Sequence, residues 1–413
     1  MYEFFLMTRY ALLQSIGLFI LIIAIIALIT IVLYTISKKL KIAKKVVIPG
    51  VILAVGVFLF FFSSQILPTQ LKYPFFLKTF GPSDGPELPL KNILTFFKHL
   101  KNFERVDIAK NPADLPPSLE RNYPQEVNVE IEAKEVIGEM ADGIIFNYWT
   151  YNGQVPGPFI RARVGDKISL TLKNDPSSLH HHSIDLHAVN GPGGGATVTM
   201  VEPGQSKTFS FKALNPGLYV YHCAHPNVAT HMTHGMYGLI LIEPEEGLPE
   251  VDKEFYVMQG EFYSAGNLGK KGLQVFDAKK MLDGHPEYIV FNGKTQALNG
   301  KMQVSVGDKV RLYVGNGGVN LTSSFHVIGE IFDNVYPEAA IGSEPHRNVQ
   351  TTLVPAGGAS IVEFKVDVPG KYIIVDHALS RLDRGAWGVM TAEGEEDKEI
   401  FDGIPDTSGS SGH

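Results

Sequence analysis

An internal repeat of short, strand-like segments limits the folds open to this chain. The stretch "RARVGDKISLTL" (161–172) returns as "QVSVGDKVRLYV" (303–314), and "VEPGQSKTFSFKALNPGLYVYHC" (201–223) returns as "VPAGGASIVEFKVDVPGKYIIVD" (354–376). Both copies alternate apolar and polar residues between turns rich in glycine and proline, a pattern typical of β-strands. The repeat therefore predicts a mainly β fold with two β-sandwiches in tandem.

Two long uncharged segments precede the repeat. Residues 11–36 and 46–67 contain no charged side chain, and each exceeds the roughly 20 residues that a helix needs to cross a bilayer. A cleaved signal peptide is the alternative for the first segment, but the segment is too long and lacks a small-residue cleavage site. The lysine-rich loop between them (37–45) should stay in the cytoplasm. The sequence thus predicts a two-helix transmembrane hairpin in the cytoplasmic membrane, with everything after Leu67 on the extracytoplasmic (periplasmic) side.

The rest of the chain is divided by changes in composition. The segment before the repeat is rich in proline and aromatic residues, and its apolar residues from Leu90 to Ile108 follow roughly helical spacing. The C-terminal residues, which end in "DTSGSSGH", are expected to be disordered. The predicted organisation is a membrane anchor (1–67), a connector with a short amphipathic helix (68–125), a first sandwich (126–245), a second sandwich (250–395) and a tail (396–413).

The single cysteine of the chain stands among histidines and methionines, in "GLYVYHCAHPNVATHMTHGMYG" (217–238). A thiolate, two imidazoles and a weak methionine are the ligands of blue-copper sites. This stretch supplies Cys223, His231 and Met236, and "LHHHSIDLHAVNG" (179–191) is the source of the missing histidine. The sequence therefore predicts a copper site in the first sandwich.

The second copy of the repeat lacks this cluster, because Val375 and Asp376 stand where the first copy has His222 and Cys223. Residues needed only for the fold would recur in both copies, so the His–Cys pair indicates a function. Successive side chains on a strand point to opposite faces. His222 and Cys223 are therefore expected to serve two different metals.

The same alternation divides the histidine-rich stretch of the first copy. His182 and His187 are five residues apart, so they point to opposite faces if this stretch is extended, and Asp185 lies on the side of His187. One set of side chains from this stretch is therefore expected on the side of Cys223, and the other set, with His187 and Asp185, on the side of His222. Alternation alone does not distinguish His182 from His180 as the partner of the cysteine.

Three segments, "HSIDLHAVNGPGGG", "YHCAHPNVATHMTHGMYGLILIEP" and "SSFHVIGEIFDNVY", resemble the copper-containing nitrite reductases, and the similarity runs over roughly residues 128–395. The resemblance implies two tandem cupredoxin-like Greek-key β-sandwiches. It also implies reduction of nitrite to nitric oxide, with a type 1 copper accepting electrons and a type 2 copper binding nitrite. The residues that it implies are His182, Cys223, His231 and Met236 for type 1 copper, His187, His222 and His326 for type 2 copper, and Asp185 as the group that hydrogen-bonds nitrite and passes it protons.

The resemblance further implies a homotrimer, in which His326 completes the type 2 site of a neighbouring subunit. On its own, His326 would more commonly be a histidine of the core. Quinol or a small redox protein is the expected electron donor. One departure concerns the proton supply, because Lys301 and Met302 stand where a relay histidine of the family is expected after "FNG".

Other functions fit the sequence less well. A laccase-like multicopper oxidase needs a second histidine just beyond the cysteine, where this chain has Ala224. A membrane-tethered cupredoxin that only relays electrons would need neither Asp185 nor His187 nor His326. A related type 1/type 2 copper oxidoreductase with another substrate stays open. The net charge of −7 gives no support to nucleic-acid binding.

Overall fold

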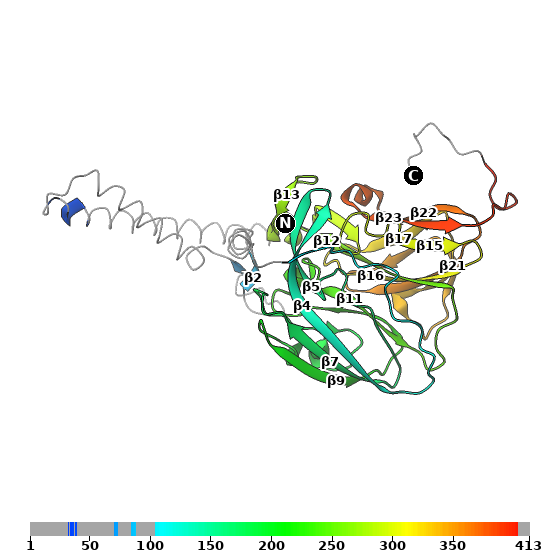
Figure 1. The fold of residues 1–413 in the computed structure, drawn as a ribbon, viewed down its shortest axis with the longest axis horizontal. Helices are drawn as coiled ribbons and strands as arrows, with labels where there is room; N and C mark the ends of the chain where they lie inside the picture. The colour runs from blue at the N-terminus through cyan, green and yellow to red at the C-terminus, as the bar shows by residue number, and fades with distance from the viewer. Residues whose placement is uncertain are drawn as a thin grey trace. The chain divides into compact units, whose positions relative to one another are not determined.

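A computed structural model of the chain describes residues 104–403 continuously (Figure 1). Before them it describes only short pieces, which are residues 32, 34–36, 38, 70–72 and 84–87. The predicted membrane spans, 11–36 and 46–67, lie outside the described residues except for a few positions, and so do residues 404–413 of the predicted tail. Among the residues that are described, no helix is long and apolar enough to cross a membrane.

The chain divides into two compact units, Met1–His99 and Leu100–His413. In the first unit, β1 (Gln70–Lys72) pairs antiparallel with β2 (Asp84–Glu87). All other described strands belong to the second unit, where they form two β-sandwiches. The mainly β fold predicted from the repeat is thereby confirmed.

The first sandwich consists of two sheets that enclose one apolar core. Its strands are β3 (Glu104–Val106), β4 (Glu126–Ala141), β5 (Ile144–Tyr151), β6 (Ile160–Arg163), β7 (Lys167–Asn174), β8 (Asp185–Leu186), β9 (Ser206–Lys212), β10 (Gly217–His222), β11 (Tyr237–Glu243) and β13 (Gly272–Gln274). One sheet has the order β13–β5–β4–β7–β9, with β3 also paired to β4, and the other has the order β6–β11–β10–β8. Ile131 and Leu170 from the first sheet pack in one cluster with Ile160 and Ile240 from the second. Two short helical segments, η1 (Pro192–Val198) and α4 (Val228–Met232), lie in its loops.

The second sandwich has its own core between two further sheets. Its strands are β12 (Lys253–Phe262), β14 (Tyr288–Phe291), β15 (Met302–Ser305), β16 (Lys309–Asn316), β17 (Ser323–Ile328), β18 (Phe332–Tyr336), β19 (His346–Val349), β20 (Thr351–Val354), β21 (Ala359–Lys365), β22 (Gly370–Asp376) and β23 (Trp387–Glu393). The sheet orders are β14–β12–β16–β21–β18–β19 and β15–β23–β22–β17–β20. Its helical segments are α5 (Ala278–Leu282), η2 (Pro337–Ala339) and η3 (Leu379–Arg384).

The two sandwiches repeat the same strand pairings. In the first, β4 runs parallel to β7, β7 is antiparallel to β9, and β11 lies between parallel β6 and antiparallel β10. In the second, β12, β16 and β21 pair in the same way, and β23 lies between parallel β15 and antiparallel β22. The repeated sequence pattern therefore encodes a repeated topology, because the same alternation and turns occur in both copies.

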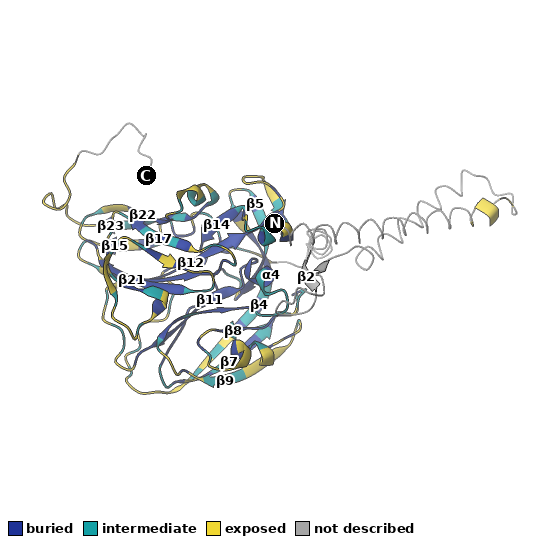
Figure 2. Cartoon of the chain, turned by 180° about the vertical axis from the view of Figure 1, so that it is seen from behind, coloured by how far each residue is buried: buried dark blue, intermediate teal, exposed yellow. Residues whose placement is uncertain are grey.

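A third apolar cluster joins the two sandwiches. It contains Leu218 and Leu239 from the first sandwich together with Tyr256 and Met258 from the second. Every residue of β11 is buried, and so is most of β12 (Figure 2). In addition, β13 comes from the second half of the chain but pairs in parallel with β5 of the first sandwich. The sandwiches are therefore packed together and also share a sheet.

The last part of the predicted connector belongs to the first sandwich. β3 pairs in parallel with β4, and the buried Ile108 packs in the cluster between the sandwiches. The helical spacing that extended as far as Ile108 is thus wrong for residues 104–108. These residues follow the sheet because an edge of β4 is open to pair with them. The preceding part of the predicted helix, residues 90–103, lies outside the described residues.

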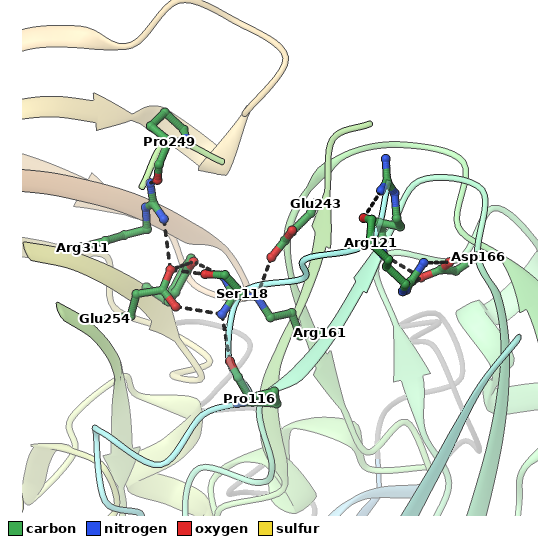
Figure 3. Close-up of polar contacts among 11 residues, drawn as sticks. Pro116, Ser118, Arg121, Arg161, Asp166, Glu243, Pro249, Glu254 and Arg311 are labelled. Carbon is green, nitrogen blue, oxygen red and sulfur yellow. Dashed lines mark hydrogen bonds and ion pairs between the residues drawn. The ribbon is translucent and has the colours of Figure 1, made fainter. Parts of the chain in front are cut away.

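A buried network of charged side chains also spans the two sandwiches (Figure 3). Arg161 on β6 donates to Glu243 at 2.5 Å and to Glu254 on β12 at 2.7 Å. Arg311 on β16 donates to Glu254 at 3.0 Å and to Glu363 at 2.6 Å. Both guanidinium side chains are only 1% exposed. Each of these charges is therefore stable inside the protein only because its partners are present.

Backbone carbonyl groups complete this network. Pro116 accepts a hydrogen bond from Arg161 at 2.8 Å, and Pro249 accepts one from Arg311 at 2.6 Å (Figure 3). Pro116 lies in the connector and Pro249 lies between the two repeats. The network thus fixes the chain segments that enter and link the sandwiches.

We expect Glu254→Gln to destabilise the protein strongly, because it leaves two buried guanidinium groups without a shared anion. The loss of unfolding free energy should be about 3–5 kcal/mol, measured by denaturant titration. Glu126→Gln is the matched control, since Glu126 pairs with Lys167 at the surface and its loss should cost roughly 0–1 kcal/mol. Equal losses in the two variants would contradict a structural role for the network.

The pH dependence of this contribution has a defined sign. Burial alone would raise the pKa of Glu254. The contacts with Arg161, Tyr313 and Arg311 lower this pKa by a larger amount, so it lies below the usual value of a glutamate. The stabilisation by Glu254 is therefore fully present above its unfolded-state pKa and is lost as the pH falls through the lower folded-state value.

Candidate metal centre

The end of β10 directs two neighbouring side chains to opposite sides of a sheet. Leu218 and Val220 pack in the cluster between the sandwiches, whereas Tyr221 and Cys223 pack inside the first sandwich. His222 has the parity of Leu218 and Val220. The alternation predicted from the sequence is therefore present, and His222 and Cys223 take part in two different clusters.

The first cluster consists of His182, Cys223 and His231, all of them buried. His182 Nδ1 lies 3.3 Å from His231 Nδ1, and Cys223 Sγ lies 3.3 Å from His231 Nδ1 and 3.9 Å from His182 Nδ1. Donor atoms bound at about 2.0–2.3 Å to one ion are separated by roughly 3–4 Å. The three atoms therefore fit a single metal ion, and a soft thiolate with two imidazoles suits copper.

Local structure brings these residues together from three segments. His182 exchanges two backbone hydrogen bonds with Val201, at 3.1 and 2.8 Å. His231 lies in α4, a single helical turn that begins after Asn227 in the left-handed conformation. Met236 directly precedes β11 and is fully buried in the core that holds Cys223.

Met236 is tied through its backbone to two of the cluster residues. Its carbonyl group accepts a hydrogen bond from the Cys223 amide at 3.1 Å, and its own amide donates to the His231 carbonyl at 3.3 Å. The predicted weak fourth ligand is thus fixed beside the cluster by main-chain contacts. The structure also separates His182 from His180, because His182 is the histidine that joins Cys223.

Burial sets the protonation states of this cluster. It raises the pKa of the Cys223 thiol to about 11 and lowers the pKa of His182 and that of His231. The imidazoles are therefore neutral and keep a lone pair for a metal. The thiol needs a bound cation to lose its proton near neutral pH, which is how metal sites of this kind load.

The second cluster consists of Asp185, His187 and His222, whose ligand atoms all lie within 4.8 Å of one another. The Nε2 atoms of the two histidines are 3.1 Å apart. His222 donates from Nδ1 to the backbone carbonyl of Cys223 at 3.0 Å, so its Nε2 carries the lone pair that faces His187. Two imidazole nitrogens and one carboxylate thus converge at a site that is more open than the first, since His187 is exposed.

A glycine-rich loop closes over Asp185. Gly193, Gly194 and Gly195 in η1 all have positive φ angles. A Cβ atom at Gly194 would lie 1.8 Å from Asp185 Oδ1, which is far inside contact distance. The loop can pass this close to the carboxylate only because that position has no side chain. The "GPGGG" stretch therefore positions Asp185.

His326 is not part of the second cluster within one chain. It lies on β17 beside His377, with ring centroids 5.3 Å apart, and its Nδ1 donates to the Gln350 carbonyl at 2.5 Å. His326 pairs with Val375 as Asp185 pairs with His222, so His326 and Asp185 occupy equivalent positions in the two copies of the repeat. The second sandwich therefore presents two imidazoles at the edge that corresponds to the metal edge of the first.

The sequence alone gave His377 no role. An alignment of the two repeats could have identified it. Asp376 aligns with Cys223, and His377 is the next residue after Asp376. Lys301 and Met302 stand where the family's relay histidine is expected, and the sequence left open which residue replaces it. Met302 begins β15 and is fully buried in the core of the second sandwich, so its side chain faces neither cluster.

Comparison with known proteins agrees with this geometry. A family model described as multicopper oxidase matches residues 134–247, which include both clusters. The copper-containing nitrite reductase of Neisseria meningitidis serogroup A is 52% identical over 297 residues, which are 71% of this chain and 76% of that protein. The copper-containing nitrite reductase of Rhizobium meliloti is 32% identical over 303 residues, which are 69% of this chain and 80% of that protein.

Solved structures share the two-sandwich fold. A copper nitrite reductase from Nitrosomonas europaea is 31% identical with a TM-score of 0.59, over 66% of this chain and 96% of that chain. A multicopper oxidase is 26% identical with a TM-score of 0.57, over 70% of this chain and 98% of that chain. The fold alone does not separate these two classes, but sequence identity over most of the relatives' length does. On that ground the chain belongs to the copper-containing nitrite reductases.

Proposed function

We propose that this protein reduces nitrite to nitric oxide and uses both clusters of the first sandwich. The observation that carries the proposal is the His222–Cys223 adjacency, which links a closed thiolate cluster to an open imidazole cluster by one peptide bond. A protein that only relays electrons would need the first cluster alone. The proposed residues are His182, Cys223, His231 and Met236 for type 1 copper, and His187, His222 and a histidine of the second sandwich for type 2 copper.

Bound copper would supply the one-electron chemistry, accepted at the type 1 site and used on nitrite at the type 2 site. The chain supplies the path between them. His222 and Cys223 are joined covalently, and His222 Nδ1 also donates to the Cys223 carbonyl. The end of β10 fixes both the peptide bond between His222 and Cys223 and the hydrogen bond to the Cys223 carbonyl. The link between the two sites therefore does not depend on a mobile loop.

Protons are the second requirement, since converting nitrite into nitric oxide and water consumes two protons with each electron. Asp185 is the acidic group of the open cluster. In its protonated form it can donate a hydrogen bond to an anion held there, and then transfer the proton. Gly194 supports this role because it lets the loop press on the carboxylate and limit its rotation.

We expect Asp185→Asn to lower nitric oxide formation about 10²–10⁴-fold, the usual contribution of a general acid, because the amide keeps the shape but transfers no proton. Nitric oxide production with an artificial reductant measures the rate, and metal analysis should still find two coppers per chain. Asp142→Asn is the matched control, since Asp142 is 98% exposed and belongs to neither cluster. An Asp185→Asn protein that retains most of its activity would refute this role.

The third ligand of the type 2 site is proposed to come from another copy of the chain. The second cluster offers two imidazoles, whereas His326 and His377 form an adjacent pair on the second sandwich. One ring of this pair completes the type 2 site of a neighbour, and the other lies beside the substrate as a second proton carrier. Contacts of this head-to-tail kind close into a ring, and the proposed assembly is a homotrimer.

Co-production of His187→Ala chains with His326→Ala chains tests the shared site. Each variant alone should be inactive, but a randomly assembled mixture should regain about a quarter of all sites, because about a quarter of the interfaces combine two intact halves from different chains. Copper analysis of His326→Ala and His377→Ala proteins then separates the two roles. The variant that drops from two coppers to one has lost the ligand, and the other should keep both coppers and lose turnover. Full activity in both single variants would contradict the shared site.

A membrane anchor is proposed for residues 1–67. Its support is the two uncharged segments with a lysine-rich loop between them, which would place the sandwiches on the periplasmic side of the cytoplasmic membrane. A tether there would bring the type 1 site close to membrane quinol or to a small redox protein as electron donor.

Removing residues 1–67 should leave activity with a small artificial reductant unchanged but abolish activity with quinol in lipid vesicles. The full-length chain in the same vesicles is the control. If the full-length protein is inactive with quinol, the segment is only a tether and the donor is a separate protein. If the truncated and full-length proteins partition equally into the soluble fraction, the anchor itself is refuted.

A further inference from the structure

A buried carboxylate lies beside the first metal cluster and has no part in the function described so far. Glu135 is on β4, where its side chain points into the first sandwich with the parity of Ile131 and Ala133. It is 0% exposed. A carboxylate in such a core is stable only with partners that compensate its charge.

Glu135 Oε1 receives three hydrogen bonds from the histidine-rich loop. The backbone amides of Leu179 and His180 donate at 2.6 and 2.9 Å, and His180 Nδ1 donates at 3.0 Å. Three N–H donors that converge on one carboxylate oxygen favour the ionised form of Glu135. The loop that carries His182 is thus held by hydrogen bonds to the carboxylate of Glu135.

The polar contact between Glu135 and His182 is incomplete. Among the described residues, neither Glu135 Oε2 nor His182 Nε2 has a hydrogen-bond partner, although both atoms are buried. His182 Nε2 lies 3.8 Å from Glu135 Oε1. His182 directs Nδ1 toward Cys223 and His231, so a ligating ring must carry its proton on Nε2. A shift of about 1 Å would bring this proton into a normal N–H···O hydrogen bond.

We infer that Glu135 is a positioning residue for the type 1 copper site, which accepts the Nε2 proton of His182 and sets the reduction potential through its negative charge. The inference rests on the type 1 site proposed above. Ligating histidines in metalloproteins generally donate their second ring N–H to a carboxylate or carbonyl, which fixes the ring orientation. A buried anion this close also stabilises the more positively charged, oxidised state of the site, and therefore lowers its reduction potential.

His180 extends this arrangement to the other ligand loop. Its ring lies against Trp149, with centroids 4.1 Å apart, and Trp149 meets His231 edge to face at 4.8 Å. His234 is also stacked on Trp149, with ring centroids 4.1 Å apart. Glu135 therefore supports His182 directly and supports His231 through His180 and Trp149.

Glu135→Gln tests the inference, because glutamine keeps the shape and can still accept at Oε1 but carries no charge. The equilibrium constant for reducing the type 1 site should rise at least tenfold, which is about 59 mV for a one-electron couple, measured by spectroelectrochemistry of the visible band. Glu139→Gln is the matched control, since Glu139 is on the same strand but exposed and should leave the potential unchanged. Equal potentials in the two variants, or a fall in Glu135→Gln, would overturn the inference.

A second measurement needs no variant and covers the case in which Glu135→Gln does not fold. In a crystal structure of the copper-loaded protein, His182 Nε2 should lie about 2.7–3.2 Å from a carboxylate oxygen of Glu135. A separation that stays at 3.8 Å, or another acceptor on Nε2, would overturn the inference. Failure of the proposed type 1 site would be visible separately, because the wild-type protein would then show no thiolate-to-copper absorption.

Discussion

The alternation of side chains along β10 is the constraint on which the chemistry depends. His222 and Cys223 are neighbours in sequence, and a strand places neighbours on opposite faces. One face is the interior of the first sandwich, and the other meets the cluster between the sandwiches. A closed site and an open site therefore arise at one point in the chain, with no extra segment needed to hold them in register.

The two clusters lie in different environments, which suit the different tasks proposed for them. His182 and Cys223 are fully buried, so the packed core holds both side chains in place. His187 is exposed, and a Cβ atom at Gly357, in a loop of the second sandwich, would lie 3.9 Å from its ring. The open cluster thus lies beside a loop of the second sandwich.

Much of this organisation could be predicted from the sequence because it depends on local periodicity. The repeat specified the paired topologies, and strand parity separated His222 from Cys223. The rest depends on contacts between residues far apart in sequence. The pairing of β13 with β5, the ring contact between His326 and His377, and the placement of Glu135 beneath the histidine-rich loop leave no local pattern. His377 and Glu135 each look like ordinary polar residues until the fold brings them to their partners.

The pairing of β13 with β5 has a consequence for how the protein folds during synthesis. The first repeat on its own would lack the strand that covers the edge of β5, and open edges promote association between chains. It would also expose Leu218, Leu239 and the rest of the apolar face that the second sandwich covers. The two copies of the repeat are therefore not separable folding units. The chain must complete synthesis beyond residue 274 before its copper-binding half can bury its own surface.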